Sequence, residues 1–138
     1  MIRRAEAADM EAVLDIRARV FIEEQGVAED LERDGCDDDA FHLIALDGDT
    51  PVGTARMLKD GSTGKIGRVA VLSSHRGTGL GKALILAALD LLRDEGFTRA
   101  KLGAQTHAIG FYEALGFTAF GPEYLDADIL HRDMERSL

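Results

Sequence analysis

The sequence predicts a mixed α/β fold, in which helices cover the faces of one sheet. Three observations support this prediction: short apolar runs of strand length alternate with helical patterns, glycine-rich turns separate the runs, and the longest helix lies between two strands. The chain has 138 residues, of which 46% are hydrophobic and 30% are charged. A chain of this size and composition is predicted to form one domain over residues 1–138 with a core of its own.

Charge and cysteine content exclude several classes of protein. Lys and Arg number 16 against 25 Asp and Glu, a formal net charge of −9, whereas nucleic-acid binders need basic residues to displace counterions from phosphate. Cys36 is the single cysteine, so neither an internal disulfide nor a cysteine-based zinc site can form. No apolar run approaches the ~20 residues that span a bilayer. We therefore expect a cytoplasmic protein that binds neither nucleic acid nor a membrane.

The N-terminal part of the chain predicts a short strand and a helix. Residues 2–6 alternate weakly between polar and apolar. Asp9 is a candidate N-cap for a helix that runs to about Gln25, and Gly26 is a natural stop. The apolar residues of this helix recur at helical spacing, at Val13, Ile16 and Val20, with Met10 and Leu14 beside them.

An acidic segment follows this helix. Residues 26–39 show no apolar periodicity and carry seven acidic side chains against the single Arg33. The composition predicts a solvated loop; a second interpretation, that the segment attracts a cationic substrate, stays open. A calcium loop is not indicated, because the required order of carboxylates around a central glycine is absent.

The remaining elements follow one another closely. Two turns, at residues 47–50 and 60–64, separate three predicted strands, Phe41–Leu46, Val52–Leu58 and Lys65–Val71. The longest helix covers Gly79–Glu95, with a broad apolar stripe at Leu80, Leu84, Ala87 and Leu91 and with Ile85, Leu89 and Leu92 on its flank. The last predicted elements are a strand parallel to the third one, a short helix and two strands, at Arg99–Gly103, Ile109–Leu115, Phe117–Phe120 and Ile129–Met134.

Three glycines stand where a strand passes into the longest helix, at Gly77, Gly79 and Gly81. Glycine allows a tight turn and a close approach of a ligand to the backbone. The first turn of a helix also presents unpaired N–H groups and the positive end of the helix dipole, so this segment is suited to bind phosphate. The spacing fits neither a Walker loop, because residues 76 and 83 are Arg and Ala, nor a dinucleotide-binding fingerprint.

The motif that does fit is Arg76-x-x-Gly79-x-Gly81, preceded by the strand Arg68-Val69-Ala70-Val71. It resembles the acetyl-CoA loop of the GNAT superfamily of N-acetyltransferases. The segment Phe111-Tyr112-Glu113-Ala114-Leu115-Gly116-Phe117 is similar to the late helix and strand of that superfamily, at the matching spacing. One branch of it, the ElaA-like acetyltransferases, resembles the chain further, at residues 20–27 (VFIEEQGV), Asp34, His42, residues 105–108 (QTHA) and His131.

The resemblance implies a GNAT-type fold, a mixed and mostly antiparallel twisted sheet with a β-α-β core that binds acetyl-CoA. It also implies transfer of an acetyl group from acetyl-CoA to a primary amine within a ternary complex. Backbone groups of the strand would pair with the pantetheine arm, and those of the loop would bind the diphosphate. The implied cofactor-binding residues are Val69, Ala70, Val71, Arg76, Gly77, Thr78, Gly79, Leu80, Gly81 and Lys82.

The reaction needs a group that takes the amine proton and a group that protonates the leaving thiolate. Deprotonating an amine of pKa ~10.4 at pH 7 costs ~4–5 kcal/mol. Candidates for the acceptor are Glu23, Glu24, His42 and His131, of which we favour Glu24. A tyrosine keeps its proton to pH ~10, above the thiol pKa of ~8.5, and the resemblance gives this donor role to Tyr112. It also points to three substrate-binding residues, Gln25, His42 and Gln105.

Three interpretations of the activity stay open. The first is an N-acetyltransferase that modifies an amine-bearing small molecule. The second is a module that binds acetyl-CoA as a sensor without turnover, and the third is an acetyltransferase that acts on an amine of a protein. The superfamily also suggests a homodimer, with the final strands as the exposed edge of the sheet. No metal is expected, since His-Glu-x-x-His is absent, and Gly-x-Ser-x-Gly is absent as well.

Overall fold

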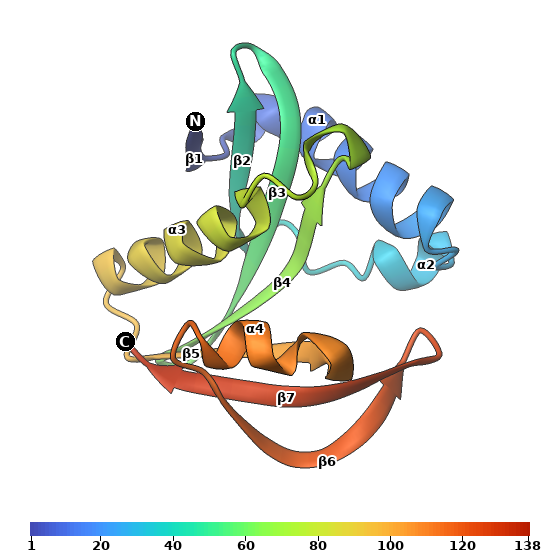
Figure 1. The fold of residues 1–138 in the computed structure, drawn as a ribbon. Coiled ribbons are helices and arrows are strands. Elements are labelled where there is room, and N and C mark those ends of the chain that lie inside the picture. The colour runs from blue at the N-terminus through green and yellow to red at the C-terminus, as the bar shows by residue number, and fades with distance from the viewer.

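The computed structural model describes all 138 residues and contains one sheet of seven strands in the order β1-β2-β3-β4-β5-β7-β6 (Figure 1). Neighbouring strands pair antiparallel except β4 and β5, which are parallel. The predicted mixed, mostly antiparallel sheet is therefore confirmed. The strands are β1 (Ile2–Arg4), β2 (Phe41–Asp47), β3 (Thr50–Asp60), β4 (Thr63–Val71), β5 (Arg99–Gln105), β6 (Thr118–Asp126) and β7 (Ile129–Ser137).

The helices pack on both faces of this sheet. The predicted N-terminal helix is present in three parts, of which the last is π-helical: η1 (Ala7–Asp9), α1 (Met10–Arg17) and η2 (Ala18–Glu24). A short helix, α2 (Glu29–Glu32), lies within the acidic segment, where a loop was expected. The other helical elements are η3 (Ser73–His75), α3 (Leu80–Asp94), η4 (Thr106–Ala108) and α4 (Ile109–Glu113).

Alternation along β4 assigns α1 and α3 to opposite faces. Ala70 is buried with Ile16 and Val20 of the N-terminal helix, whereas its neighbours Val69 and Val71 pack against the larger core under α3. Successive side chains of a strand point to opposite faces. The two helices therefore enclose β4 between them, and a residue of β4 can face either one.

The core under α3 explains why this helix is long and regular. Its side chains Leu84, Ile85, Ala88, Leu89 and Leu92 are at most 1% exposed and pack on the sheet. The buried face of the helix is rotated relative to the predicted stripe. Leu80, Ala87 and Leu91 are only partly buried, at the margin of this core. The broad apolar face still confirms that the helix is held by packing against the sheet.

β4 and β5 separate soon after they begin. They pair only where Thr63, Gly64 and Lys65 face Arg99, Ala100 and Lys101, although β4 continues to Val71 and β5 to Gln105. On its other edge β4 contains a bulge, since Ala55 of β3 stands opposite two residues, Arg68 and Val69. Arg68 has a φ of 49°, a left-handed conformation that is unusual for a residue with a side chain. A bulge bends its strand, and here the bend carries β4 away from β5.

Gly64 shows how closely α3 packs on the start of β4. A Cβ atom at this position would collide with the side chain of Leu92, which is fully buried. We expect Gly64→Ala to lower the free energy of unfolding by about 1–3 kcal/mol, the usual cost of overpacking a core. Gly110→Ala is the matched control, because a Cβ there meets open space. Urea unfolding of both variants tests this, and equal midpoints would contradict the packing described.

Candidate active site

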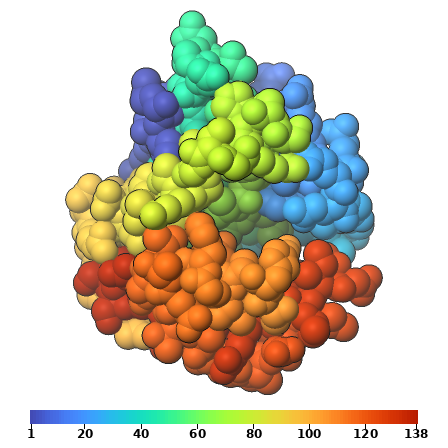
Figure 2. Space-filling view, in the orientation of Figure 1, coloured from blue at the N-terminus to red at the C-terminus, as the bar shows by residue number.

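A cavity of about 440 Å³ occupies the space between the separated strands. Figure 2 shows the surface hollowed between the loop that precedes α3, the N-terminal helical segment and α4. The cavity is lined by parts of the chain that lie far apart in sequence: β4, β5, η2, the acidic segment, α4 and the β6–β7 hairpin. It is thus the place where the fold gathers side chains for chemistry.

The loop before α3 presents a row of unpaired backbone amides. The N–H groups of residues 77–82 donate no hydrogen bond within the protein, and no side chain caps the helix. Gly77 and Gly79 have φ angles of 77° and 84°, a left-handed backbone that glycine adopts without strain. The amides lie at the N-terminus of a 15-residue helix, whose dipole adds positive potential. This arrangement can bind an anion with several oxygen atoms.

Arg76 connects this loop to the N-terminal helical segment. Its Nη1 and Nη2 atoms lie 2.7 and 2.9 Å from the two carboxylate oxygens of Glu24, and its Nε donates to the carbonyl of Val71 over 3.0 Å. The hydrogen bond from Arg76 lowers the pKa of Glu24. Glu24 does not line the cavity. The residue favoured as proton acceptor is instead engaged in fixing the first residue of the loop.

Tyr112 lines the cavity from α4. Its half-buried ring makes edge-on contacts with Phe111 and Phe117, at centroid distances of 5.0 and 6.1 Å. The hydroxyl forms no hydrogen bond with another protein group, and burial raises the pKa of Tyr112. The phenol therefore keeps its proton and has a donor available at the cavity.

His131 lines the cavity from β7, beside Tyr124 of β6. Its Nδ1 lies 2.7 Å from the carbonyl oxygen of Ile129, and because a carbonyl only accepts, Nδ1 carries the hydrogen and Nε2 is left as an acceptor. The ring stacks on Tyr124 at 5.9 Å, and the Tyr124 hydroxyl donates to Asp133 over 2.7 Å. Burial and then this carboxylate raise the pKa of Tyr124. Tyr124 lies outside the motifs found in the sequence, which gave no signal for its place here.

The structure brings together some of the other predicted residues. Gln25 and Gln105 line the cavity with Val69. His42 does not line it; the ring is 5% exposed, and its Nε2 donates to the carbonyl of Asp37 over 2.9 Å. His42 therefore binds the acidic segment to the sheet, and its prediction as a substrate-binding residue is not supported by this position. Ala70 likewise packs toward α1 and contributes only backbone to the edge of β4.

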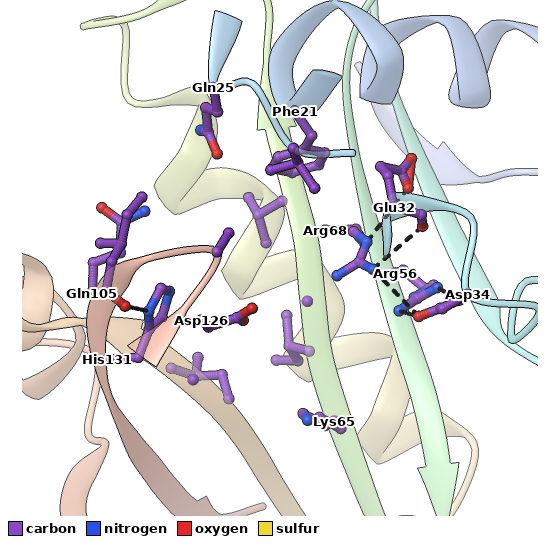
Figure 3. A pocket seen from close by; sticks show the side chains of 18 of the residues that line it. Phe21, Gln25, Glu32, Asp34, Arg56, Lys65, Arg68, Gln105, Asp126 and His131 are labelled. Carbon is purple, nitrogen blue, oxygen red and sulfur yellow. Dashed lines mark hydrogen bonds and ion pairs between the residues drawn. The ribbon is translucent and has the colours of Figure 1, made fainter. Parts of the chain in front are cut away.

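Six charged residues form a network against one wall of the cavity, and we call it the arginine–carboxylate network. Arg17, fully buried, donates to Glu32 over 2.7 Å and to Asp37 over 2.6 Å. Arg56 bonds to Asp34 over 2.8 Å, and Arg68 approaches the same carboxylate to 3.3 Å. Figure 3 shows the contacts of Arg68 and Arg56 with Glu32 and Asp34 on one side of the pocket. The members are Arg17, Arg56, Arg68, Glu32, Asp34 and Asp37.

This network corrects the prediction of a solvated acidic loop. Glu32 is 1% exposed, and buried arginines require counter-charges because desolvation of an unpaired charge is very costly. The hydrogen bond from Arg56 holds the pKa of Asp34 below its ordinary value. Burial opposes the same change at Asp37, but the hydrogen bond from Arg17 still lowers its pKa. The expectation of a solvated segment still applies to Glu29, Asp30, Asp38 and Asp39, which stay exposed.

The sequence contains a signal for this network, although the composition of the acidic segment does not indicate it. Arg17 is four residues after Val13 and three before Val20, within the apolar stripe of the N-terminal helix. Arg56 and Arg68 each stand between two apolar or small neighbours in their strands. An arginine on an apolar face predicts a buried carboxylate partner, and the acidic segment is the nearest supply of carboxylates.

Residues 10–117 match the model of the Acetyltransferase (GNAT) family. The chain belongs to the GNAT acetyltransferase family. This confirms the resemblance read from Arg76-x-x-Gly79-x-Gly81, and it makes the protein an enzyme of the acetyltransferase class. The separated strands, the loop of free amides and the cavity beside Tyr112 are therefore parts of a GNAT fold.

Relatives within the GNAT family cover nearly the whole chain. The uncharacterised N-acetyltransferase YjcF of Bacillus subtilis is 38% identical over 121 residues, 86% of each chain. ElaA of Escherichia coli is 32% identical over 132 residues, 92% of this chain and 86% of ElaA, and its crystal structure superposes with a TM-score of 0.86, covering 99% of both chains. An acyl-CoA N-acyltransferase from Pseudomonas aeruginosa gives a TM-score of 0.90 at 31% identity, covering 99% of this chain and 98% of its own. The predicted similarity to the ElaA-like branch is confirmed.

The structure also bears on metals and membranes. No group of three or more His, Cys, Asp or Glu side chains is arranged to hold a metal ion. None of the helices combines the length and the apolar character needed to cross a membrane.

The arginine–carboxylate network predicts a large effect for loss of one member. Arg17→Met leaves Glu32 buried without its main partner, so we expect the free energy of unfolding to fall by about 3–5 kcal/mol. Arg19→Met is the matched control; Arg19 pairs with Asp15 over 3.1 Å with both side chains exposed, and such pairs contribute about 0–1 kcal/mol. Urea unfolding measures both. A similar small loss in the two variants would show that the buried charges are not coupled as described.

Proposed function

We propose that this protein is an acetyl-CoA-dependent N-acetyltransferase that acetylates a primary amine of a small molecule within a ternary complex. The observation that carries the proposal is the row of free amides at residues 77–82, continuous with the unpaired edge of β4 and followed by a cavity that contains Tyr112. These features follow one another as an anion site, an open strand edge and a proton donor. Their order suits a long ligand that has a diphosphate at one end and a thioester at the other.

Acetyl-CoA would supply an activated acetyl group as a thioester. The amides of residues 77–82 would hold its diphosphate, and Thr78 and Lys82 belong to the same turn. The backbone of Val69, Ala70 and Val71 would pair with the pantetheine arm as a further strand, in the space that β5 leaves free. An N–H group of this edge would stabilise negative charge on the thioester oxygen. Glycine at residue 81 is consistent with this assignment. A Cβ there would extend into the open space beside the loop, where the diphosphate would bind.

The proton of the acceptor amine has to leave before the amide bond forms. We propose His131 as the acceptor of that proton in place of Glu24. Glu24 has a lowered pKa and is bound by Arg76, which makes its carboxylate a weaker base. His131 lines the cavity with Nε2 free to accept, and histidine is the side chain that most often transfers protons in catalysis. Gln25 and Gln105 are proposed to contact the acceptor.

Tyr112 is proposed to protonate the leaving thiolate. As the new carbon–nitrogen bond forms and the carbon–sulfur bond breaks, the sulfur gains negative charge and needs a proton. Burial raises the pKa of Tyr112, so the phenol holds its proton until a thiolate is present. The nitrogen gives up a second proton as the amide forms, and water would carry this proton to Tyr112, which restores the phenol.

Two other activities stay as alternatives. A sensor would bind acetyl-CoA without turnover, and a protein acetyltransferase would modify an amine of a polypeptide. The cavity volume of about 440 Å³ and the wall formed by the arginine–carboxylate network favour a small acceptor. Release of free thiol from acetyl-CoA, measured with amines, amino sugars and peptides, discriminates between the three. A cytoplasmic location and a homodimer through the exposed edge strand β6 belong to the same proposal.

A substitution at Gly81 is expected to change cofactor binding without lowering the stability of the protein. The residue lies in the first turn of α3 with no atom within 4 Å of an added Cβ, so Gly81→Leu should leave the urea midpoint unchanged or raise it, because leucine favours helix. We expect acetyl-CoA affinity to fall at least about tenfold in calorimetry, since the side chain would fill the diphosphate site. The same change at Gly110, another helical glycine beside open space, should not alter affinity. Unchanged affinity for Gly81→Leu would place the diphosphate elsewhere.

Tyr112 can be tested without disturbing its packing. Tyr112→Phe keeps the ring against Phe111 and Phe117 and removes the only polar atom. We expect kcat to fall by about 10²–10⁴-fold, the range for loss of a positioned proton donor, while calorimetry shows the same affinity for acetyl-CoA. If kcat is retained with an accepted amine, Tyr112 does not protonate the thiolate.

A further inference from the structure

We propose that the acceptor amine also carries a carboxylate, as amino acids do. Its carboxylate would bind at the β4 wall of the cavity against Arg68 and Lys65, and its amino group would face Asp126 and His131 on the β6–β7 hairpin. This inference rests on the proposed acetyltransferase function and names the substrate class of the same site.

Arg68 lies on the β4 wall, and part of its guanidinium group forms no hydrogen bond within the protein. Nη2 of Arg68 donates to the carbonyls of Leu31 and Glu32 and to the Asp34 carboxylate, over 3.2, 3.3 and 3.3 Å. Nη1 forms no hydrogen bond, whereas Nε is buried and lies 3.6 Å from the Glu32 carboxylate. These contacts fix the group at the wall and leave Nη1 as the donor for a ligand. Guanidinium groups match the planar geometry of a carboxylate.

The charges that line the cavity are divided between its two walls. The arginine–carboxylate network has three members of each sign, so it contributes little net charge. Lys65 of β4 lines the cavity without an ion-pair partner, and so does Asp126 of β6. Figure 3 shows Arg68 and Lys65 along the strand, with Asp126 and His131 across the pocket from them. The β4 wall is therefore positive and the hairpin wall negative.

A zwitterion satisfies both walls, and other amines do not. A diamine would bring a positive charge against Lys65 and leave the donors of Arg68 unpaired. A phosphorylated amine would bring a dianion close to Asp34, whose carboxylate is 3.3 Å from Nη2 of Arg68. A site with a donor placed for one group of the ligand discriminates against ligands that lack the matching acceptor. The placement of the amino group by Asp126 also brings it toward His131, the proposed proton acceptor.

The test compares matched pairs of acceptors by thiol release from acetyl-CoA. The probes are the common α-amino acids, β-alanine and 4-aminobutyrate, each against its amide. We expect kcat/KM of at least one amino acid to exceed that of its amide by about tenfold or more, the effect of a hydrogen bond between charged groups. Arg68→Gln should raise KM for the amino acid more than KM for its amide, so that the ratio of the two kcat/KM values falls to about one.

Two controls keep the result interpretable. Arg33→Gln removes an exposed arginine that is 3.8 Å from Glu32 and does not line the cavity, and it should keep the preference for carboxylate. If Arg68→Gln unfolds, Lys65→Met, at an exposed position, is expected to lower the preference about threefold or more. Calorimetry with acetyl-CoA accompanies each variant, since a loss of affinity there would reflect the cofactor site.

The outcomes for the two proposals are distinct. Acetylation of amines without preference for a carboxylate, or equal losses for amino acid and amide in Arg68→Gln, overturns the inference and leaves the proposed function in place. Binding of acetyl-CoA with no accepted amino acid also overturns it. No heat with acetyl-CoA and no thiol release with any amine overturns both.

Discussion

The separation of β4 from β5 is the constraint on which the rest of the structure depends. The strands pair only as far as Lys65 and Lys101, and beyond that point the edge of β4 has no strand partner. A continuous sheet would press β4 against β5 and leave no cavity between them. The bulge at Arg68 maintains the separation, and its left-handed backbone costs about 1–3 kcal/mol. Contacts elsewhere in the molecule have to offset that strain.

The arginine–carboxylate network supplies these contacts. Arg68 reaches the acidic segment with three hydrogen bonds from one nitrogen, and the same segment neutralises Arg17 at the end of α1. Opening the bulge would thus expose or unpair buried charge, which is far more unfavourable than the strain it would relieve. One set of charges therefore fixes the bulge, the N-terminal helix and a wall of the cavity. This coupling explains why so acidic a segment is ordered over the sheet.

Local signals in the sequence predicted most of the fold and several of the elements that surround the cavity. Glycine spacing and apolar periodicity located α3, the loop before α3 and the strands that flank them, because these features depend on neighbouring residues. The bulge at Arg68 and the position of Tyr124 depend on how distant strands meet, and no local pattern encodes that. The prediction for the acidic segment was incomplete for a related reason. Composition alone predicts solvation, whereas Glu32 and Asp34 are paired with arginines that are distant in the sequence. Only the unexpected place of Arg17 among apolar residues pointed to them.

Glu24 and His131 show why the chemistry of a residue follows from its partners. Both can accept a proton as free side chains. Glu24 binds Arg76 through both oxygens, so protonating it would break an ion pair that holds the loop before α3. His131 donates from Nδ1 to a carbonyl, a contact that survives protonation and that orients Nε2 as the acceptor. Burial meanwhile favours the neutral form of Tyr112. In the proposed reaction, the proton from the amine and the proton for the sulfur would thus involve separate groups, and neither step would require the loop before α3 to change.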